Sequence, residues 1–267
     1  AIIEEEDGEI GYVGTDDAVI FVNFRSDRAV QLSKKFTESR IPNLHYLTMT
    51  QYHEDLECRI AFPPESVENT FGDVISAAGL KQLRITETEK YNHVTYFFNA
   101  KRSESLEGED RILLDTYSNI ATHDERPEMR TPDIAQQILE DMKACTHDVI
   151  IANLCNADMV GHTAKMSAIK TAVETVDTAI GAIAEIGLKH GYAVILTADH
   201  GNAEETIDER TGEPKTSHTT NPVPLILVSK QLTSLKRDTG TLIDIAPTML
   251  KILALPKPVE MTGQSLQ

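Results

Sequence analysis

Short, almost continuously apolar segments alternate along this chain with longer stretches whose apolar residues recur at helical spacing. Residues 148–153 and 193–197 are such segments, with only apolar residues between their ends, and residues 168–190 between them carry the helical pattern. Strands without a polar face are typical of parallel sheets that are covered by helices on both sides. The alternation therefore predicts an α/β fold with a mostly parallel sheet flanked by helices.

The rest of the chain extends the same alternation. Further strands are predicted at residues 17–24, 44–49, 83–85, 93–98 and 223–228, and further helices at residues 28–36, 70–78 and 131–145. Pro63 and Pro64 break any helix and hold the backbone extended, which indicates a hinge. We therefore predict two domains, residues 1–66 including the hinge and residues 67–267.

Charge and composition exclude several classes of function. The 267 residues carry a formal net charge of −17, which disfavours nucleic acids and anionic membranes as partners. No stretch approaches the length of an apolar membrane span, and no signal pattern is visible. The three cysteines are widely spaced, which favours buried, reduced thiols and a cytoplasmic protein. Because the chain opens on Ala1 and an acidic run, we expect a further segment before it.

Three polar turns follow predicted strands, at residues 156–162, 197–204 and 216–221. Ligands of doubly wound sheets gather at the carboxyl ends of strands, so these turns are candidates for one site. Asp158 and His162 stand four residues apart and would share one face of a helix. On spacing alone, a helix cap and a solvated neighbour remain the alternative interpretation of this pair.

The residue types of these turns suit divalent metal ions. Asp199 and His200 are adjacent, and at a sharp turn they could serve one ion or bridge two. Mixed carboxylate and imidazole ligands suit borderline and hard ions, and the absence of cysteine from the turns argues against a structural zinc site. Two neighbouring ions would stabilise the attacking and leaving oxygens of a phosphoryl transfer. They would also supply positive charge that the acidic chain otherwise lacks.

Five segments of the sequence carry a further signal, namely Asp158-Met-Val-Gly-His162, Thr197-Ala-Asp-His-Gly-Asn-Ala203, His218-Thr-Thr-Asn-Pro-Val-Pro224, Asn23-Phe-Arg-Ser-Asp-Arg28 and Leu83-Arg-Ile-Thr-Glu-Thr-Glu-Lys-Tyr91. With them, nearly the whole chain resembles the C-terminal portion of the cofactor-independent phosphoglycerate mutases, which belong to the alkaline-phosphatase superfamily. The Asp-His-Gly sequence alone would indicate only the superfamily, whereas the arginine and Glu-Lys-Tyr segments are more specific to the mutases.

The resemblance implies an alkaline-phosphatase-like metal-binding domain and the remnant of a second α/β phosphotransferase domain. Asp158, His162 and His218 resemble the ligands of one metal ion, and Asp199 and His200 resemble part of the set for a second. The family completes the second site with an aspartate and a nucleophilic serine from an N-terminal stretch. Nothing in this chain matches that stretch, so we expect no catalytic nucleophile in it.

Three basic residues resemble the substrate-binding groups of the family, namely Arg25, Arg28 and Lys90. Two guanidinium groups three residues apart can converge on one phosphate, although two surface arginines near Asp27 are the alternative. Lys90 resembles an active-site lysine, and a surface charge pair with its glutamate neighbours is its alternative. The glutamate-rich runs 87–89 and 107–110 are read as solvated faces.

By resemblance, the parent protein is an isomerase of glycolysis that interconverts 3-phosphoglycerate and 2-phosphoglycerate through a phosphoserine intermediate, without 2,3-bisphosphoglycerate. Manganese is the first choice for its two divalent ions, with magnesium, cobalt and zinc as alternatives. The parent is expected to be a monomer, whereas this chain alone is expected to be inactive and to expose sheet edges that favour self-association.

Two other functions stay open. A phosphopentomutase or a phosphatase of the same superfamily would share the Asp and His ligands, but should lack the Asn-Phe-Arg-x-x-Arg segment. The chain could also act as a metal-binding fragment without catalysis.

Overall fold

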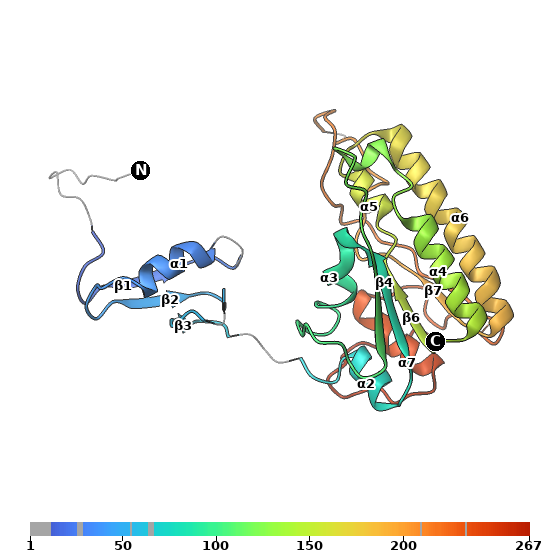
Figure 1. Cartoon of the computed structure of the whole chain (residues 1–267), viewed down its shortest axis with the longest axis horizontal. Helices are drawn as coiled ribbons and strands as arrows, with labels where there is room; N and C mark the ends of the chain where they lie inside the picture. The colour runs from blue at the N-terminus through green and yellow to red at the C-terminus, as the bar shows by residue number, and fades with distance from the viewer. Residues whose placement is uncertain (1–11, 26–28, 54, 64–66, 209, 233) are drawn as a thin grey trace. The chain divides into compact units, whose positions relative to one another are not determined.

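The computed structural model describes residues 12–25, 29–53, 55–63, 67–208, 210–232 and 234–267. The chain divides into two compact units, residues 1–66 and 67–267. Each is described by itself below, with the element labels of Figure 1. Arg28 and Pro64 lie outside the described residues, so the predictions made for them stay predictions.

The first unit is a small parallel sheet with one helix. Its strands follow the order β1-β2-β3, and each pair is parallel. The helix packs on the sheet through Tyr46, whose ring stacks on Phe36 at 5.1 Å and whose hydroxyl lies 2.9 Å from Ser33 Oγ. The elements are β1 (Ala18–Phe21), α1 (Ala29–Thr37), β2 (His45–Thr48) and β3 (Arg59–Ile60).

The second unit is built on a parallel sheet of order β5-β4-β6. Its central strand β4 (Gln82–Glu87) is buried along its whole length, as expected for a strand covered on both faces. The neighbours are β5 (Glu109–Leu114) and β6 (Val149–Ala152). A further pair, β7 (Val194–Leu196) and β8 (Ile226–Val228), is antiparallel, because no helix returns the chain between these two strands in the described residues.

Helices cover both faces of this sheet, as Figure 1 shows. The main core lies between β4 and the helices α4 and α6, where Leu83 and Ile85 pack against Ile138 and Ile183. A second cluster packs α2 and α7 against Val149 of β6. The α/β fold predicted from the alternating pattern is thus confirmed. The helices of this unit are α2 (Phe71–Ala77), α3 (Tyr91–Val94), α4 (Thr131–Ala144), α5 (Asn156–Gly161), α6 (Met166–His190) and α7 (Ile245–Ile252), with short 3₁₀ turns η1 (Thr88–Lys90), η2 (His123–Glu125) and η3 (Leu242–Asp244).

The strand predicted at residues 93–98 is wrong. The segment begins inside α3 and continues as turns, and the Thr95 hydroxyl donates to the carbonyl of Tyr91 at 2.7 Å. Val94 is buried, and Phe98 packs edge-on against Phe71 of α2. These apolar contacts stand four residues apart, which is a helical period, although the composition of the segment is β-like.

Strand β5 was not predicted, because it begins on the charged residues Glu109, Asp110 and Arg111. The interpretation of residues 107–110 as a solvated face is wrong for Glu109, which is buried. Its carboxylate accepts hydrogen bonds from Arg111 Nε at 2.5 Å and from Asn99 Nδ2 at 2.7 Å. A buried carboxylate is tolerated where its charge is paired in this way.

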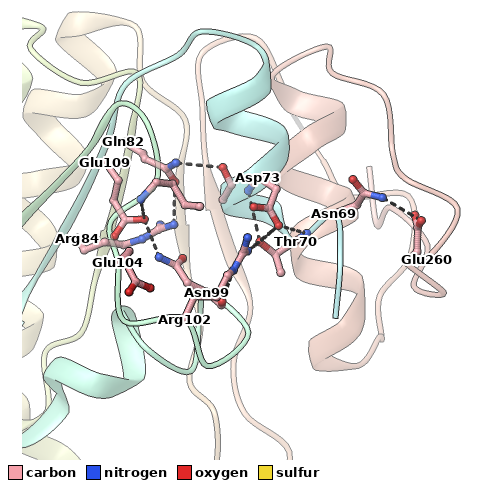
Figure 2. A network of polar contacts seen from close by, with 12 residues as sticks. Asn69, Thr70, Asp73, Gln82, Arg84, Asn99, Arg102, Glu104, Glu109 and Glu260 are labelled. Carbon is pink, nitrogen blue, oxygen red and sulfur yellow. Dashed lines mark hydrogen bonds and ion pairs between the residues drawn. The ribbon is translucent and has the colours of Figure 1, made fainter. Parts of the chain in front are cut away.

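The face of β4 toward α2 is polar as well as buried. Figure 2 shows Gln82 and Arg84 side by side there, with the Arg84 guanidinium donating to Gln82 Oε1 at 2.7 Å. The guanidinium carbon also lies 4.3 Å from the centre of the Phe98 ring. Burial lowers the pKa of Arg84 to about 10, which still leaves it protonated at neutral pH. Its charge faces Glu109 in the same network.

Three cysteines are present as free thiols. Cys155 is buried, as predicted for small apolar residues, and Cys58 is partly buried. The prediction is wrong for Cys145, which is exposed because it ends α4 in a left-handed conformation. In the described part of the chain, none of the helices has the length and apolar character that crossing a bilayer would require.

Candidate metal centre

Helix α5 begins just beyond the carboxyl end of β6 and carries the first two candidate ligands. Asp158 lies in its first turn, and His162 is the residue that ends the helix. Their side chains meet on one face, with Asp158 Oδ1 3.1 Å from His162 Nε2. The four-residue spacing in the sequence therefore corresponds to direct contact in space.

His218 joins this pair from a loop more than fifty residues further along the chain. Its Nε2 lies 3.2 Å from Asp158 Oδ1 and 3.2 Å from His162 Nε2. Within the described residues, ligand atoms of these three side chains all lie within 4.8 Å of one another. We call Asp158, His162 and His218 the primary cluster.

The donor atoms of the primary cluster fit a divalent ion. His162 Nδ1 lies 2.6 Å from the carbonyl oxygen of Thr216, which can only accept, so Nδ1 carries the hydrogen. In the neutral ring, Nε2 then presents its lone pair to Asp158 and His218. A backbone carbonyl that holds the remote nitrogen of a histidine is the common support of a metal-binding imidazole. Two imidazole nitrogens and one carboxylate oxygen leave further coordination positions for water or substrate.

Asp199 and His200 lie beside the primary cluster rather than in it. They occupy the turn after β7, and Asp199 Oδ2 lies 3.5 Å from His200 Nε2. The His200 ring stacks on the His218 ring with a centroid separation of 3.6 Å. More than half of the Asp199 side chain is exposed. This pair offers one carboxylate and one imidazole at the rim of the cluster.

Lys90 points at the cluster. Its Nζ lies 2.7 Å from Asp158 Oδ2, and only 11% of its side chain is exposed. The alternative interpretation, a surface charge pair with neighbouring glutamates, is therefore wrong. Burial on its own raises the pKa of the Asp158 carboxyl, but hydrogen bonds from Lys90 and Asn202 outweigh it and leave the pKa below its usual range.

Glu87, the last residue of β4, is also buried, so the solvated interpretation of residues 87–89 is wrong for it. Its carboxylate accepts from the Thr116 hydroxyl at 3.2 Å and from the backbone N–H of Arg130 at 3.3 Å, and it contacts the thiol of Cys155. Glu87 thereby connects the end of β4 with the segments that begin α4 and α5. The strand end that leads to Lys90 is held from three sides.

Two polar residues that sequence reasoning left without a role hold the ligand loops together. Asn202 Nδ2 donates to Asp158 Oδ1 at 2.9 Å. The Glu204 carboxylate accepts from the backbone N–H of Asn202 at 2.7 Å, from Asn221 Nδ2 at 3.0 Å and from the Thr219 hydroxyl. It therefore joins the turn that carries His200 to the loop that carries His218. The only sequence signal was their place within the polar turn at residues 197–204.

Two glycines of the ligand motifs are required by close approach. A Cβ at Gly201 would lie 2.2 Å from Thr219 Oγ1 and 2.3 Å from Glu204 Oε1. A Cβ at Gly161 would lie 2.6 Å from Asn202 Oδ1. Such contacts are shorter than van der Waals distance, so the loops can pack at this distance only because both positions lack a side chain.

The predicted phosphate-binding arginines belong to the first unit. Arg25 follows β1, where its backbone N–H donates to Asn23 Oδ1 at 3.0 Å and its carbonyl accepts from Asn23 Nδ2 at 3.0 Å. This local turn sets the direction in which the chain leaves the strand. Because Arg28 is outside the described residues, convergence of the two guanidinium groups stays a prediction.

Comparison with known proteins identifies the family of the chain. The family model of the metalloenzyme superfamily matches residues 23–257. The chain is 46% identical over 275 residues to a 2,3-bisphosphoglycerate-independent phosphoglycerate mutase of Acetivibrio thermocellus, covering 99% of this chain and 53% of that protein. A mutase of the same name from Clostridium botulinum is 48% identical over 258 residues, covering 94% of this chain and 50% of that protein.

A solved structure shows the same relationship. The fold matches a structure of Leishmania mexicana phosphoglycerate mutase at low cobalt concentration, with a TM-score of 0.75 and 28% identity, over 98% of this chain and 53% of that one. The chain thus spans about half the length of the relatives it matches. These matches confirm the resemblance to cofactor-independent phosphoglycerate mutases. The chain belongs to the metalloenzyme superfamily.

Proposed function

We propose that this chain supplies the metal-binding and phosphate-binding part of a 2,3-bisphosphoglycerate-independent phosphoglycerate mutase. The observation that carries the proposal is the meeting of Asp158, His162 and His218 with Lys90 at the carboxyl end of the sheet. Relatives that share almost half of the residues are named as such mutases, which favours this activity over a phosphopentomutase or a phosphatase. The reaction would interconvert 3-phosphoglycerate and 2-phosphoglycerate, a step of glycolysis in the cytoplasm.

In this proposal the primary cluster holds one divalent ion, and Asp199 with His200 holds part of the coordination of a second. Manganese is our first choice for both, with magnesium, cobalt and zinc as alternatives, since mixed carboxylate and imidazole ligands discriminate poorly among these ions. When bound, such ions stabilise negative charge on a phosphoryl group and favour the ionised form of a nucleophile. Asn202 bonds the turn after β7 to Asp158, and Glu204 bonds the same turn to the loop that carries His218.

The basic residues hold the anionic substrate. Lys90 can donate to a phosphate oxygen from its buried position beside Asp158. Arg25 and Arg28, in the first unit, are assigned to phosphate binding because guanidinium groups bind phosphate through paired hydrogen bonds. On a chain with a net charge of −17, such local positive groups are needed to retain a phosphorylated acid.

The two units of the chain suggest two separate functions. We assign residues 67–267 to the metal-binding phosphatase domain and residues 1–66 to a phosphotransferase domain that grips substrate. No residue of this chain matches the nucleophilic serine of the family or the aspartate that accompanies it. We therefore propose that the chain on its own binds metal but does not complete the mutase cycle.

Calorimetry with Mn²⁺ tests the ligand assignment. The unchanged chain is expected to show one tight site, and His218→Ala is expected to lose it, because the loop then offers no imidazole to the pair on α5. His190→Ala is the matched control, since His190 ends the 25-residue helix α6, about 36 Å of helix from its start. Full Mn²⁺ binding by His218→Ala would overturn the ligand set.

A coupled assay with 3-phosphoglycerate tests the second part of the proposal. The pure chain is expected to form no 2-phosphoglycerate at any Mn²⁺ concentration. Robust turnover by the pure chain would show that a nucleophile is present among its own residues and that the assignment of the serine is wrong.

A further inference from the structure

The two oxygens of the Asp158 carboxylate have different partners. Oδ2 lies 2.7 Å from Lys90 Nζ. Oδ1 faces the imidazoles, at 3.1 Å from His162 Nε2 and 3.2 Å from His218 Nε2, and it accepts from Asn202 Nδ2 at 2.9 Å. A cation of the protein therefore occupies one side of the carboxylate, and the nitrogens of the primary cluster occupy the other.

We propose that Lys90 controls the affinity and the coordination number of the metal site at the primary cluster. By holding Oδ2, it restricts Asp158 to a single ligand oxygen, and by its charge it weakens the hold on a divalent ion. The proposal rests on the proposed role of Asp158, His162 and His218 as metal ligands. Lys90 acts on that site through Asp158 and is, in this respect, a positioning residue.

The first physical reason is that Lys90 is fixed in place. It ends η1 directly after β4, and the Glu87 carboxylate anchors that strand end to Thr116 and Arg130. Only 11% of the Lys90 side chain and 14% of the Asp158 side chain are exposed. The ammonium group therefore does not behave as a mobile surface charge, and water screens it little.

The second reason is the chemistry of carboxylate ligands. A free carboxylate can bind an ion through one oxygen or through both. With Oδ2 already bonded to an ammonium group, one-oxygen binding through Oδ1 is favoured, and one more position on the ion stays available for water or a phosphate oxygen. Catalytic metal sites differ from structural ones in keeping such a position open.

The contact also connects metal binding with phosphate binding. If Asp158 bound a divalent ion through Oδ1, less negative charge would remain for its bond to Lys90, and the ammonium group would be available to an anionic oxygen. Because coupling between two ligands is reciprocal, a phosphate that draws Lys90 from Oδ2 would strengthen the hold on the ion.

The test is Mn²⁺ calorimetry on the full chain and on Lys90→Met, with proton relaxation of water to count the water molecules on bound Mn²⁺. Lys90→Met is expected to bind Mn²⁺ about tenfold more tightly, because a buried positive charge close to the ion has been removed. The water count is expected to fall by one, because the second oxygen of Asp158 becomes a ligand. A purely structural role for Lys90 predicts the opposite sign, since a loosened Asp158 would bind the ion less tightly.

Lys165→Met is the matched control. Lys165 precedes α6 in the same unit and pairs with Asp124 at 2.5 Å, and 61% of its side chain is exposed. The variant removes the same charge without touching Asp158, so its Mn²⁺ affinity is expected to stay within about twofold of the unchanged chain, because solvent screens an exposed charge.

Lys90→Gln removes the charge of Lys90 but keeps a hydrogen-bond donor. It also provides the test of the proposal if Lys90→Met does not fold. Its amide can still donate to Oδ2, so tighter Mn²⁺ binding with an unchanged water count is expected. If the unchanged chain has a tight site and the folded Lys90 variants bind Mn²⁺ no more tightly than it does, the inference about Lys90 is wrong while the ligand assignment stands. Absence of a tight site in the unchanged chain, or its survival in His218→Ala, overturns the ligand assignment and this inference with it.

Discussion

His200 stacks on His218, with their ring centroids 3.6 Å apart and their planes inclined by 17°. The contact joins the turn after β7 to the loop that completes the primary cluster. His200 is nevertheless absent from the group of side chains whose ligand atoms lie within 4.8 Å of one another in the described residues. We therefore expect the two imidazoles to serve two neighbouring metal positions rather than one.

His200→Ala should accordingly leave the tight Mn²⁺ site largely intact. A stacked ring pair contributes about 1 kcal/mol, so the affinity of the primary cluster is expected to fall by less than about tenfold. The weaker second binding event, which depends on Asp199 and His200, is expected to disappear. Titration calorimetry measures both events in one experiment, and loss of the tight event would contradict the division into two positions.

Gly201→Ala should damage the site through packing alone. The new Cβ would lie 2.2 Å from Thr219 Oγ1, so the Thr219 side chain or the loop that carries it must shift, at a cost of about 1–3 kcal/mol in unfolding free energy. Gly181→Ala is the control, because Gly181 sits inside α6 and its added Cβ would meet no heavy atom within 4 Å apart from its own helical backbone. There alanine is expected to stabilise by about 0.5–1 kcal/mol. Urea unfolding measures whether Gly201→Ala lowers and Gly181→Ala raises the free energy of unfolding.

Glu204→Gln should lower the free energy of unfolding by an amount that depends on pH. Burial alone raises the pKa of the Glu204 carboxyl, but hydrogen bonds from Thr219, Asn221 and the Asn202 backbone outweigh it and hold the pKa at about 2. Because this value lies below the ordinary 4.5, the carboxylate stabilises the fold above about pH 4.5, and the contribution is lost as the pH falls toward 2.

The measurement is the difference in unfolding free energy between Glu204→Gln and the unchanged chain, without metal, from pH 7 to pH 3. The difference is expected to be constant down to about pH 4.5 and to shrink below it. Glu174→Gln, on the exposed side of α6, serves as the control and is expected to change little. A difference that grows toward low pH would contradict the prediction.

Glu87→Gln should raise the free energy of unfolding at neutral pH, whereas Glu204→Gln should lower it. Burial raises the pKa of the Glu87 carboxyl, so the folded chain favours the protonated form, and the charged form costs stability once the pH rises through the raised value. The neutral amide avoids this cost, and the variant is expected to be about 1 kcal/mol more stable at pH 7, with the gain vanishing near pH 4.

Glu109→Gln is the comparison for Glu87→Gln, because Glu109 is also a buried glutamate and lies on β5, the strand next to β4. Its carboxylate is paired with Arg111 at 2.5 Å, so removal of its charge leaves a mostly buried guanidinium without its partner. A loss of about 3 kcal/mol at pH 7 is expected. Equal effects of the two substitutions would show that the pairing of a buried carboxylate does not decide its contribution.

Elements with a clear local period were predictable from the sequence. Helices α4 and α6 and strand β6 lie within two residues of their predicted bounds, because repeated spacing of apolar residues specifies both the element and the face that it buries. The contact between Asp158 and His162 was predictable for the same reason. Four residues along a helix bring two side chains together whatever the rest of the chain does.

Contacts between distant segments had no such signal. Residues 93–98 have a β-like composition, yet packing of Phe98 on Phe71 and the hydrogen bond of Thr95 hold them in a helix and turns. Glu87 looked like a surface residue, because a single sequence does not show that Thr116 and Arg130 come to meet it. Burial of a charged group depends on partners that the fold brings from elsewhere.

The sequence by itself determined the α/β alternation, the Asp158–His162 pair and, through its motifs, the family. His218 was expected in the cluster from the resemblance, but only the tertiary structure shows its contact with Asp158, the hold of Lys90 on one oxygen of Asp158 and the hydrogen bonds by which Glu204 joins the two ligand loops. Periodicity acts over a few residues, whereas these contacts connect residues 15 to 68 positions apart. Their distances depend on how strands and loops pack, and packing is a property of the whole domain.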